Sequence, residues 1–430
     1  MLKFTVSRDD HVYACFPDIA MCPDGTMVCV YRECMGHSFY PFSRMVVRRS
    51  FDEGRTWTDR QIIAEVVNSA EAVDLMRPWL EEDSLAGYEE TRSRLTEDGK
   101  LGSGINCPRV ICLQDGSLFA IVDLLLLDNR WTNWIWRSYD SGVTWLGPEK
   151  PDLLEGLVPS IVQLRDGDLL VGLAELTSPD LFTQFVQRSG DGGRTWSEPV
   201  FLPMTEAVEP DEVGYVELDD GTLVGFARNS VCEKRRVPSG AVKVISKDGG
   251  RTWAGPFDTW MVGCTGRPAV GLLRSGEVCV TYRCTMPNEM LAMHVMTQDA
   301  ARFERLDQLV PRRPMPEDIP ARLAQERGEQ LPWYMRDYYP GRTIILDWDR
   351  CVHRDEGYTA WFQLASGDIY VVDYITDDAP LAQIRGYQVS RSDIILFPEG
   401  DMPGLCPTGA PFRAITQAMI NHQIAENRLR

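Results

Sequence analysis

Ser189-Gly190-Asp191-Gly192-Gly193-Arg194-Thr195-Trp196 is one of four copies of a single pattern, Ser-x-Asp-x-Gly-x-Thr-Trp; the others begin at Ser50, Ser138 and Ser246. The pattern is typical of a hairpin turn, because Ser and Asp side chains bond backbone amides and Gly adopts a positive φ. The closing Trp can bury its ring between neighbouring sheets. Turn chemistry explains every fixed residue, so the repeat indicates a fold and no reaction.

A second repeat surrounds the first. Six stretches of alternating apolar residues run into an Asp-Gly or Ser-Gly turn and out again, which predicts six β-hairpins. Their turn glycines are Gly25, Gly116, Gly167, Gly221, Gly276 and Gly367. The intervals between these glycines are 91, 51, 54, 55 and 91 residues. We call the Ser-x-Asp-x-Gly-x-Thr-Trp pattern a box; in four units the aspartate of a box follows the turn glycine by 24 to 27 residues. This spacing predicts an all-β fold, a six-bladed β-propeller with four strands per blade, over residues 1–430 as one domain.

The less regular parts of the chain are assigned from the same spacing. Thr297-Gln298-Asp299 and Ser390-Arg391-Ser392 stand where blades five and six should carry a box, and we interpret them as degenerate copies. The long intervals predict insertions over about 68–104 and 302–342, and excursions of this length are commonly lids or binding loops. For the second, aromatic insertion the alternative is a packed arm or a dimer contact. Either Lys3 to Ser7 or a strand after Tyr387 could close the ring, and Phe412 to Arg430 is expected to form a terminal helix.

Composition narrows the function classes. A net charge of -19 argues against nucleic acid or an anionic membrane as a partner. The chain opens without a basic segment and an apolar run, and no stretch is long enough to span a bilayer, so we expect a cytoplasmic protein. The 12 cysteines show no Cys-x-x-Cys pair and should be reduced core residues, and five histidines make a multi-histidine metal site improbable. No cofactor is expected.

Equal offsets from the six turn glycines predict a site. The innermost strand of each blade lines the central channel, so residues in the same phase of every blade converge on the axis. Nine residues before the glycines stand Phe16, Cys107, Val158, Glu212, Arg267 and Tyr358. Seven residues after them stand Arg32, Asp123, Ala174, Arg228, Arg283 and Tyr374.

The ionisable residues of both sets predict a shared polar pocket, because charges are rarely tolerated between packed sheets. Blades four, five and six supply most of this pocket, and Arg32 and Asp123 are expected to approach it from across the central channel. Gathered arginines repel one another unless an anion or carboxylates compensate, and guanidinium groups suit a carboxylate. A sugar acid is therefore the natural ligand. An inert salt-bridge network would use the same residues.

The boxes and two further segments resemble the sialidase superfamily. Asp211 to Leu218, followed by Ala227-Arg228, looks like the segment with the glutamate partner of the nucleophile and an arginine of the carboxylate-binding triad. Gly357-Tyr358-Thr359-Ala360 looks like the segment with the nucleophilic tyrosine. The resemblance implies that Glu212 deprotonates Tyr358, which attacks an anomeric carbon that carries a carboxylate.

Three departures from that pattern imply a changed substrate. Sialidases open their first blade with Arg-Ile-Pro, where this chain has Cys15-Phe16-Pro17. The family's acid is an aspartate in the loop after the first hairpin, but 33–44 contains no Asp, and its plausible proton donors are Glu33 and His37. The third triad arginine has no clean match, though Arg267 or Arg283 could supply its charge.

Three functions stay open from the sequence. The first is an exo-acting glycoside hydrolase that removes a terminal carboxylate-bearing sugar from an oligosaccharide or glycoconjugate. The second is a neutral-sugar glycosidase with Glu212 and Glu175, or a uronate lyase with Tyr358 and His353, which lies five residues earlier. The third is a non-catalytic glycan-binding propeller. A homo-oligomer is left open.

Overall fold

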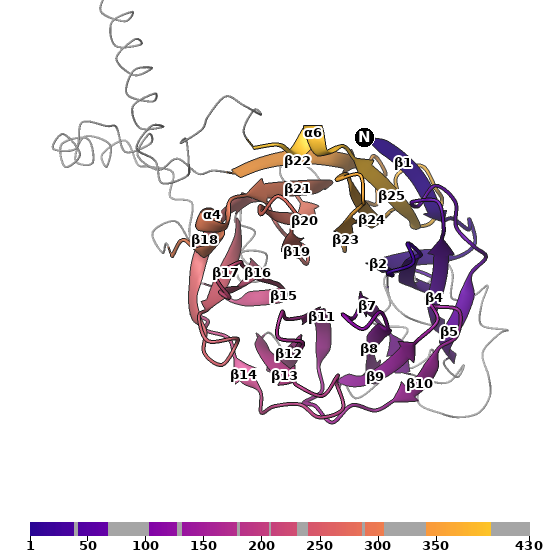
Figure 1. Ribbon diagram of the computed structural model, residues 1–430. Helices are drawn as coiled ribbons and strands as arrows, with labels where there is room; N and C mark the ends of the chain where they lie inside the picture. The colour runs from indigo at the N-terminus through magenta and orange to yellow at the C-terminus, as the bar shows by residue number, and fades with distance from the viewer. Residues whose placement is uncertain are drawn as a thin grey trace, which may run out of the picture.

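The six predicted blades form a ring of antiparallel sheets (Figure 1). The computed structural model describes residues 1–37, 42–67, 103–126, 131–178, 181–205, 208–229, 240–285, 289–304 and 341–396. Within them the helices are short: α4 (Gln298–Arg302) and α6 (Arg391–Ile394). The predicted all-β, six-bladed propeller is confirmed.

Each blade runs from an inner strand at the channel to an outer strand at the rim. Blade one consists of β2 (Tyr13–Met21), β3 (Met27–Cys34), β4 (Phe42–Ser50) and β5 (Gln61–Val67). Blade two consists of β7 (Arg109–Cys112), β8 (Leu118–Leu126), β9 (Trp131–Ser138) and β10 (Leu146–Glu149), with β6 (Ser103–Ile105) also paired to β8. Blade three consists of β11 (Leu157–Gln163), β12 (Leu169–Ser178), β13 (Leu181–Ser189) and β14 (Val200–Phe201).

The other three blades repeat this order. Blade four consists of β15 (Pro210–Glu217), β16 (Leu223–Asn229), β17 (Gly240–Ser246) and β18 (Ala254–Val262). Blade five consists of β19 (Ala269–Leu272), β20 (Val278–Cys284), β21 (Met290–Met296) and β22 (Gly341–Trp348). Blade six consists of β23 (Ala360–Gln363), β24 (Ile369–Ile375), β25 (Gln383–Val389) and the N-terminal strand β1 (Leu2–Ser7).

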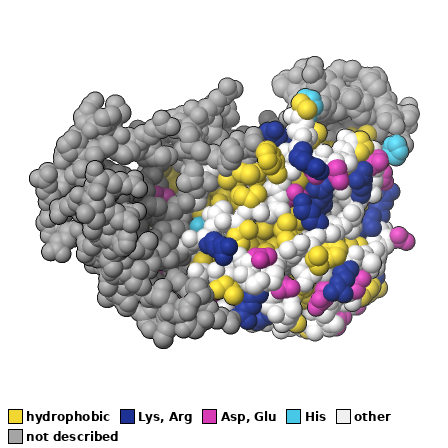
Figure 2. Space-filling view, turned by 90° about the horizontal axis from the view of Figure 1, so that it is seen from above, with side chains coloured by type: hydrophobic (Ala, Val, Ile, Leu, Met, Phe, Trp, Pro, Cys, Tyr) yellow, Lys and Arg dark blue, Asp and Glu magenta, His cyan; other side chains and the backbone are white. Residues whose placement is uncertain are grey.

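The N-terminal strand closes the ring. Lys3 of β1 pairs with Tyr387 of β25, so the first of the two predicted closures is the one that forms. Outer strands β1 and β22 carry exposed apolar residues, including Leu2, Ile345 and Trp348. Figure 2 shows apolar side chains gathered among charged ones on this rim.

The boxes join neighbouring blades, as turn chemistry predicts. In the first box Gly54 N–H donates to Ser50 Oγ (2.9 Å), and Thr56 Oγ1–H donates to Asp52 Oδ2 (2.6 Å). The same pair of bonds forms in the other three boxes. A Cβ on Gly54 would overlap the ring of Tyr370 in blade six, whose hydroxyl donates to Gly54 O (2.8 Å). The boxes are therefore structural links between blades.

The two degenerate boxes are not box turns. At their places lie helices α4 and α6, and the hydroxyl of Thr297 caps α4 by accepting from Ala300 N (3.2 Å). Neither segment has the glycine and Thr-Trp that complete the turn, so each backbone closes as a short helix instead. The two predicted insertions fall almost entirely outside the described residues, as does the predicted terminal helix over 412–430.

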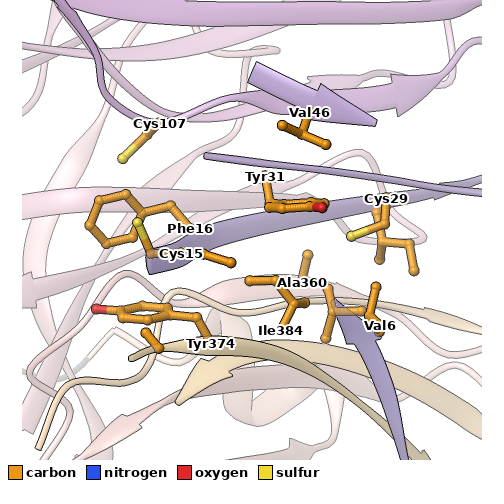
Figure 3. Close-up of a cluster of buried hydrophobic side chains, with 14 of the residues drawn as sticks. Val6, Cys15, Phe16, Cys29, Tyr31, Val46, Cys107, Ala360, Tyr374 and Ile384 are labelled. Carbon is orange, nitrogen blue, oxygen red and sulfur yellow. The ribbon is translucent and has the colours of Figure 1, made fainter. Parts of the chain in front are cut away.

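Apolar side chains fill the six junctions between blades. Figure 3 shows the junction of blades one and six, where Phe16 of β2, Tyr31 of β3, Ala360 of β23 and Tyr374 of β24 pack together. The cysteines in the described residues are free and mostly buried, as expected. No helix of the described part of the chain is long and apolar enough to cross a bilayer.

Candidate active site

The inner strands of blades one and four are irregular where predicted site residues stand. The pairing register shifts between Cys15 and Asp18 in β2 and between Asp211 and Gly214 in β15. Within these bulges Phe16 and Glu212 have φ of 55° and 49°, a left-handed conformation that costs a non-glycine residue about 1–3 kcal/mol. Both side chains reach Tyr358 of blade six, so the strained backbone orients them toward the channel axis.

Tyr358, Glu212 and Arg228 form a continuous hydrogen-bonded chain across blades six and four. The hydroxyl of Tyr358 donates to Glu212 Oε1, and Arg228 Nη1 donates to Glu212 Oε2 (3.0 Å). Glu212 is buried, whereas the Arg228 side chain is 21% exposed, so the arginine forms the open side of this group.

The electrostatics of this hydrogen-bonded group suit proton transfer from the phenol of Tyr358 to Glu212. Burial, with the Glu212 charge as the next cause, raises the pKa of Tyr358 well above its usual value. Burial would also raise the pKa of Glu212, but Arg228 and the Tyr358 hydrogen bond outweigh it and lower that pKa. A buried phenol of high pKa needs an adjacent base to become a nucleophile, and Glu212 is ionised and in contact with its proton.

Arg283 lies beside Tyr358 because two glycines let it approach. A Cβ on Gly357 would overlap the Arg283 stem, and one on Gly266 would lie 3.0 Å from Arg283 Cβ. The guanidinium donates to the backbone oxygens of Thr265 (2.9 Å) and Glu356 (3.2 Å). Arg283 is half-buried, so it can present its charge together with Arg228.

Arg267 packs against the ring of Tyr358 and forms part of the channel wall. It is 3% exposed, its guanidinium carbon lies 5.9 Å from the Tyr358 ring centre, and it donates to Pro159 O (2.8 Å) and Thr359 O (2.6 Å). Burial, followed by the nearby charge of Arg109, lowers the pKa of Arg267 to about 10. It also lines a cavity of about 350 Å³ that is bordered by residues of the inner strands. The predicted clamp residue is therefore part of the channel wall beneath Tyr358.

Arg32 and Asp123 lie deeper than predicted, and this corrects their expected approach across the central channel. Arg32 is fully buried with its guanidinium 4.4 Å from the centre of the Phe16 ring, and it donates to Cys15 Sγ (3.3 Å). Asp123 is fully buried, accepts from Asn106 Nδ2 (2.8 Å), and has a pKa raised by burial to about 6. Arg32 is therefore closed to ligands in this arrangement.

The structure separates the candidate proton donors. Glu33 is 1% exposed and accepts from Arg60 Nη1 (3.2 Å), so it stabilises blade one and is closed to ligands. His37 is 46% exposed at its side chain, and its Nδ1 lies 2.6 Å from Asp355 Oδ2. His353 is exposed, and its backbone oxygen accepts from Thr376 Oγ1 (3.3 Å). His37 and His353 line one pocket of about 530 Å³.

Sequence reasoning missed Asp355 and proposed Glu175 as a catalytic partner of Glu212. Asp355 does not stand at an equivalent position of the repeat. The one sequence feature that could have pointed to it is its place three residues before Tyr358. Glu175, proposed as a second carboxylate, follows Ala174 in β12 and therefore points to the other face of the sheet from the position equivalent to Arg228. Glu212 has Tyr358 and Arg228 as its partners instead. Among the described residues, no group of three or more His, Cys, Asp or Glu side chains could hold a metal ion.

The sequence matches the BNR repeat-like domain family over residues 77–371. A protein of unknown function from Dyadobacter fermentans is similar in structure, with TM-score 0.62, 17% identity, and coverage of 90% of this chain and 97% of that one. A Hadza microbial sialidase gives TM-score 0.58 and 15% identity, covering 92% and 69%. A mutant of NanB sialidase from Streptococcus pneumoniae gives TM-score 0.56 and 11% identity, covering 91% and 70%. Comparison with curated proteins finds no significant sequence match.

Proposed function

The chain belongs to the BNR repeat-like domain family and is a six-bladed propeller of the sialidase superfamily, and on this basis we propose that it is an exo-acting glycoside hydrolase. Its substrate is a glycan with a terminal carboxylate-bearing sugar, either a sialic acid or a uronic acid. The observation that carries the proposal is the hydrogen-bonded chain of Tyr358, Glu212 and Arg228.

The reaction follows from these contacts. Glu212 takes the phenolic proton as Tyr358 oxygen bonds to the anomeric carbon and the bond to the leaving oxygen breaks. The leaving oxygen keeps the bonding electrons and receives a proton from an acid. Water then attacks the same carbon and gives a proton to the group that protonated the leaving oxygen; the tyrosyl bond breaks, and Tyr358 recovers its proton from Glu212.

The charges around Tyr358 support an acidic sugar. Arg228 and Arg283 are the partly exposed arginines of the predicted clamp, and their guanidinium groups can bind a carboxylate. A carboxylate nucleophile would be repelled by such a substrate, whereas a phenol enters the reaction neutral. Arg267 adds positive charge beneath the ring without needing to touch the ligand.

A hydrolysis screen of aryl glycosides of sialic, uronic and neutral sugars tests the proposal. We expect turnover of an acidic sugar and a loss of kcat by a factor of about 10³ or more in Tyr358→Phe. Tyr215→Phe is the matched control, because the Tyr215 hydroxyl is buried in blade four and has no hydrogen-bond partner among the described residues. Full activity in Tyr358→Phe would overturn the nucleophile assignment, and an ultraviolet-absorbing product would indicate a uronate lyase.

Glycan binding without catalysis is the second candidate. It is favoured by the absence of an arginine at Cys15 and by the cover that Phe16 places over Arg32. A titration with free sialic and uronic acids separates the two, since binding by a protein that turns over none of the glycosides supports this candidate.

A further inference from the structure

Asp355 gathers polar groups from blades one and six around one carboxylate. Its Oδ2 lies 2.6 Å from His37 Nδ1 and also accepts from the hydroxyl of Tyr13. Its Oδ1 accepts from the hydroxyl of Tyr374 (2.7 Å). His37 follows β3 in blade one and Asp355 precedes β23 in blade six, so the pairing forms only when the ring closes.

The surroundings of Asp355 keep it ionised. Burial would raise its pKa, but the hydrogen bond and charge of His37, with the tyrosine hydroxyls, outweigh burial and lower it. Two further carboxylates lie near it: Asp349 Oδ2 accepts from the backbone amide of Asp355 (3.3 Å), and Glu289 is close enough to interact with the charge of Asp355. A charged carboxylate at Nδ1 holds the Nδ1 proton of the imidazole, so Nε2 is the ring atom left to exchange a proton with a ligand.

The ring of Phe16 links His37 to the reacting group, because it contacts both His37 and Tyr358. Its centre lies 5.4 Å from that of His37 and 4.7 Å from that of Tyr358, both in edge contacts. The left-handed backbone at Phe16 fixes this ring between the two side chains. His37 and Tyr358 therefore pack against the same ring, which brings the imidazole and the phenol to one part of the site.

The pocket beside His37 has the shape and lining to receive the leaving group. Its volume is about 530 Å³, within the usual range for ligand sites. Met35, Pro380 and Leu381 supply apolar surface to this pocket, and His37 and Asp355 supply polar groups. Such a lining suits a pyranose, which has an apolar face and hydroxyl edges.

We propose that His37 and Asp355 form the proton-transfer dyad of this enzyme and that the pocket they line is the subsite for a neutral sugar leaving group. This inference rests on the proposed function. Nε2 of His37 gives its proton to the glycosidic oxygen as the anomeric carbon–oxygen bond breaks and the tyrosyl bond forms. It then takes a proton from the water that hydrolyses the tyrosyl intermediate, and Asp355 acts as a positioning residue throughout.

The test is a series of glycosides of the preferred sugar that differ in their leaving group. Nitrophenol leaves as an anion and needs no protonation by an acid, whereas the hydroxyl oxygen of a pyranose must be protonated as it leaves. We expect His37→Gln and Asp355→Asn to lose about a hundred- to ten-thousand-fold in kcat/KM on the pyranoside. On the nitrophenyl glycoside they should lose less than about tenfold. Restoration of part of the loss by Asp355→Glu would support a positioning role.

Matched controls are His11→Gln and Asp299→Asn, which change exposed residues of the same types. An equal loss on every leaving group in the dyad variants would overturn the dyad while leaving the Tyr358 result intact. Unchanged pH–rate profiles in His37→Gln would also overturn it. If the wild-type protein cleaves no glycoside of the series, both the dyad and the proposed function are overturned.

Discussion

The hydroxyl of Tyr358 in blade six donates a hydrogen bond to the carboxylate of Glu212 in blade four, 146 residues away in the chain. Because Arg228 holds the other oxygen of that carboxylate, Glu212 is fixed between a proton source and a permanent positive charge. The pair is therefore arranged so that the phenol can lose its proton without a large movement of either side chain.

Replacing Glu212 should abolish most of the proposed activity. In Glu212→Gln the amide cannot take the Tyr358 proton, and we expect kcat on an activated aryl glycoside to fall by about 10²–10⁴-fold. Steady-state kinetics at pH 7 measures this. Glu175→Gln is the control, and a larger loss in that variant would favour the two-carboxylate mechanism instead.

Arg283 should discriminate acids from their neutral analogues. Lysine keeps the charge of Arg283 but loses the planar guanidinium, so Arg283→Lys should weaken binding of the sugar acid by about tenfold, or about 1.4 kcal/mol. Binding of the corresponding sugar amide should hardly change. Calorimetric titration with both ligands checks this. Arg274→Lys serves as control, because Arg274, in the hairpin of blade five, also donates to backbone oxygens, those of the blade-six hairpin. Equal weakening for acid and amide would contradict a carboxylate contact.

The first box should be sensitive to one methyl group. Gly54 has φ of 81°, and an alanine there would overlap the Tyr370 ring, so Gly54→Ala should lower the free energy of unfolding by about 2–5 kcal/mol. Gly192→Ala, at φ of 74° with open space around it, should cost about 1–2 kcal/mol. Urea unfolding measures both, and similar losses would show that blade contact at Gly54 is unimportant.

Glu356 should make stability fall as pH rises. Burial, with the nearby charge of Asp373, raises the pKa of Glu356 to about 10, whereas in the unfolded chain it is about 4.3. Between these values the folded state holds a proton that the unfolded state has released, so the folded state loses stability by up to about 1.4 kcal/mol per pH unit.

A neutral side chain at this position removes that slope. Glu356→Gln should therefore gain stability over the wild type by a margin that widens from pH 5 to pH 8 in urea unfolding. The exposed Glu198→Gln should show no such trend. A margin that stays constant with pH would mean that Glu356 is not protonated in the folded protein.

The sequence by itself determined the ring of blades, since turns are local. Each hairpin glycine and each Ser-x-Asp-x-Gly box closes through bonds within a few residues, so composition and spacing predict them without knowledge of the rest. Equal offsets then identified Glu212, Arg228 and Tyr358 as neighbours, because related blades place equivalent positions around one axis. Where box residues were missing, as at Thr297, the local rule failed and a helix formed.

Only the tertiary structure decided which of the aligned residues face a ligand. Arg32 and Arg267 occupy the predicted phase, yet Phe16 covers one and Tyr358 lies over the other. The contact of His37 with Asp355 joins residues 318 positions apart and follows no repeat. Depth in the channel and contacts across the closing blades depend on bulges and on side-chain packing, which arise from the whole ring and leave no periodic trace in the sequence.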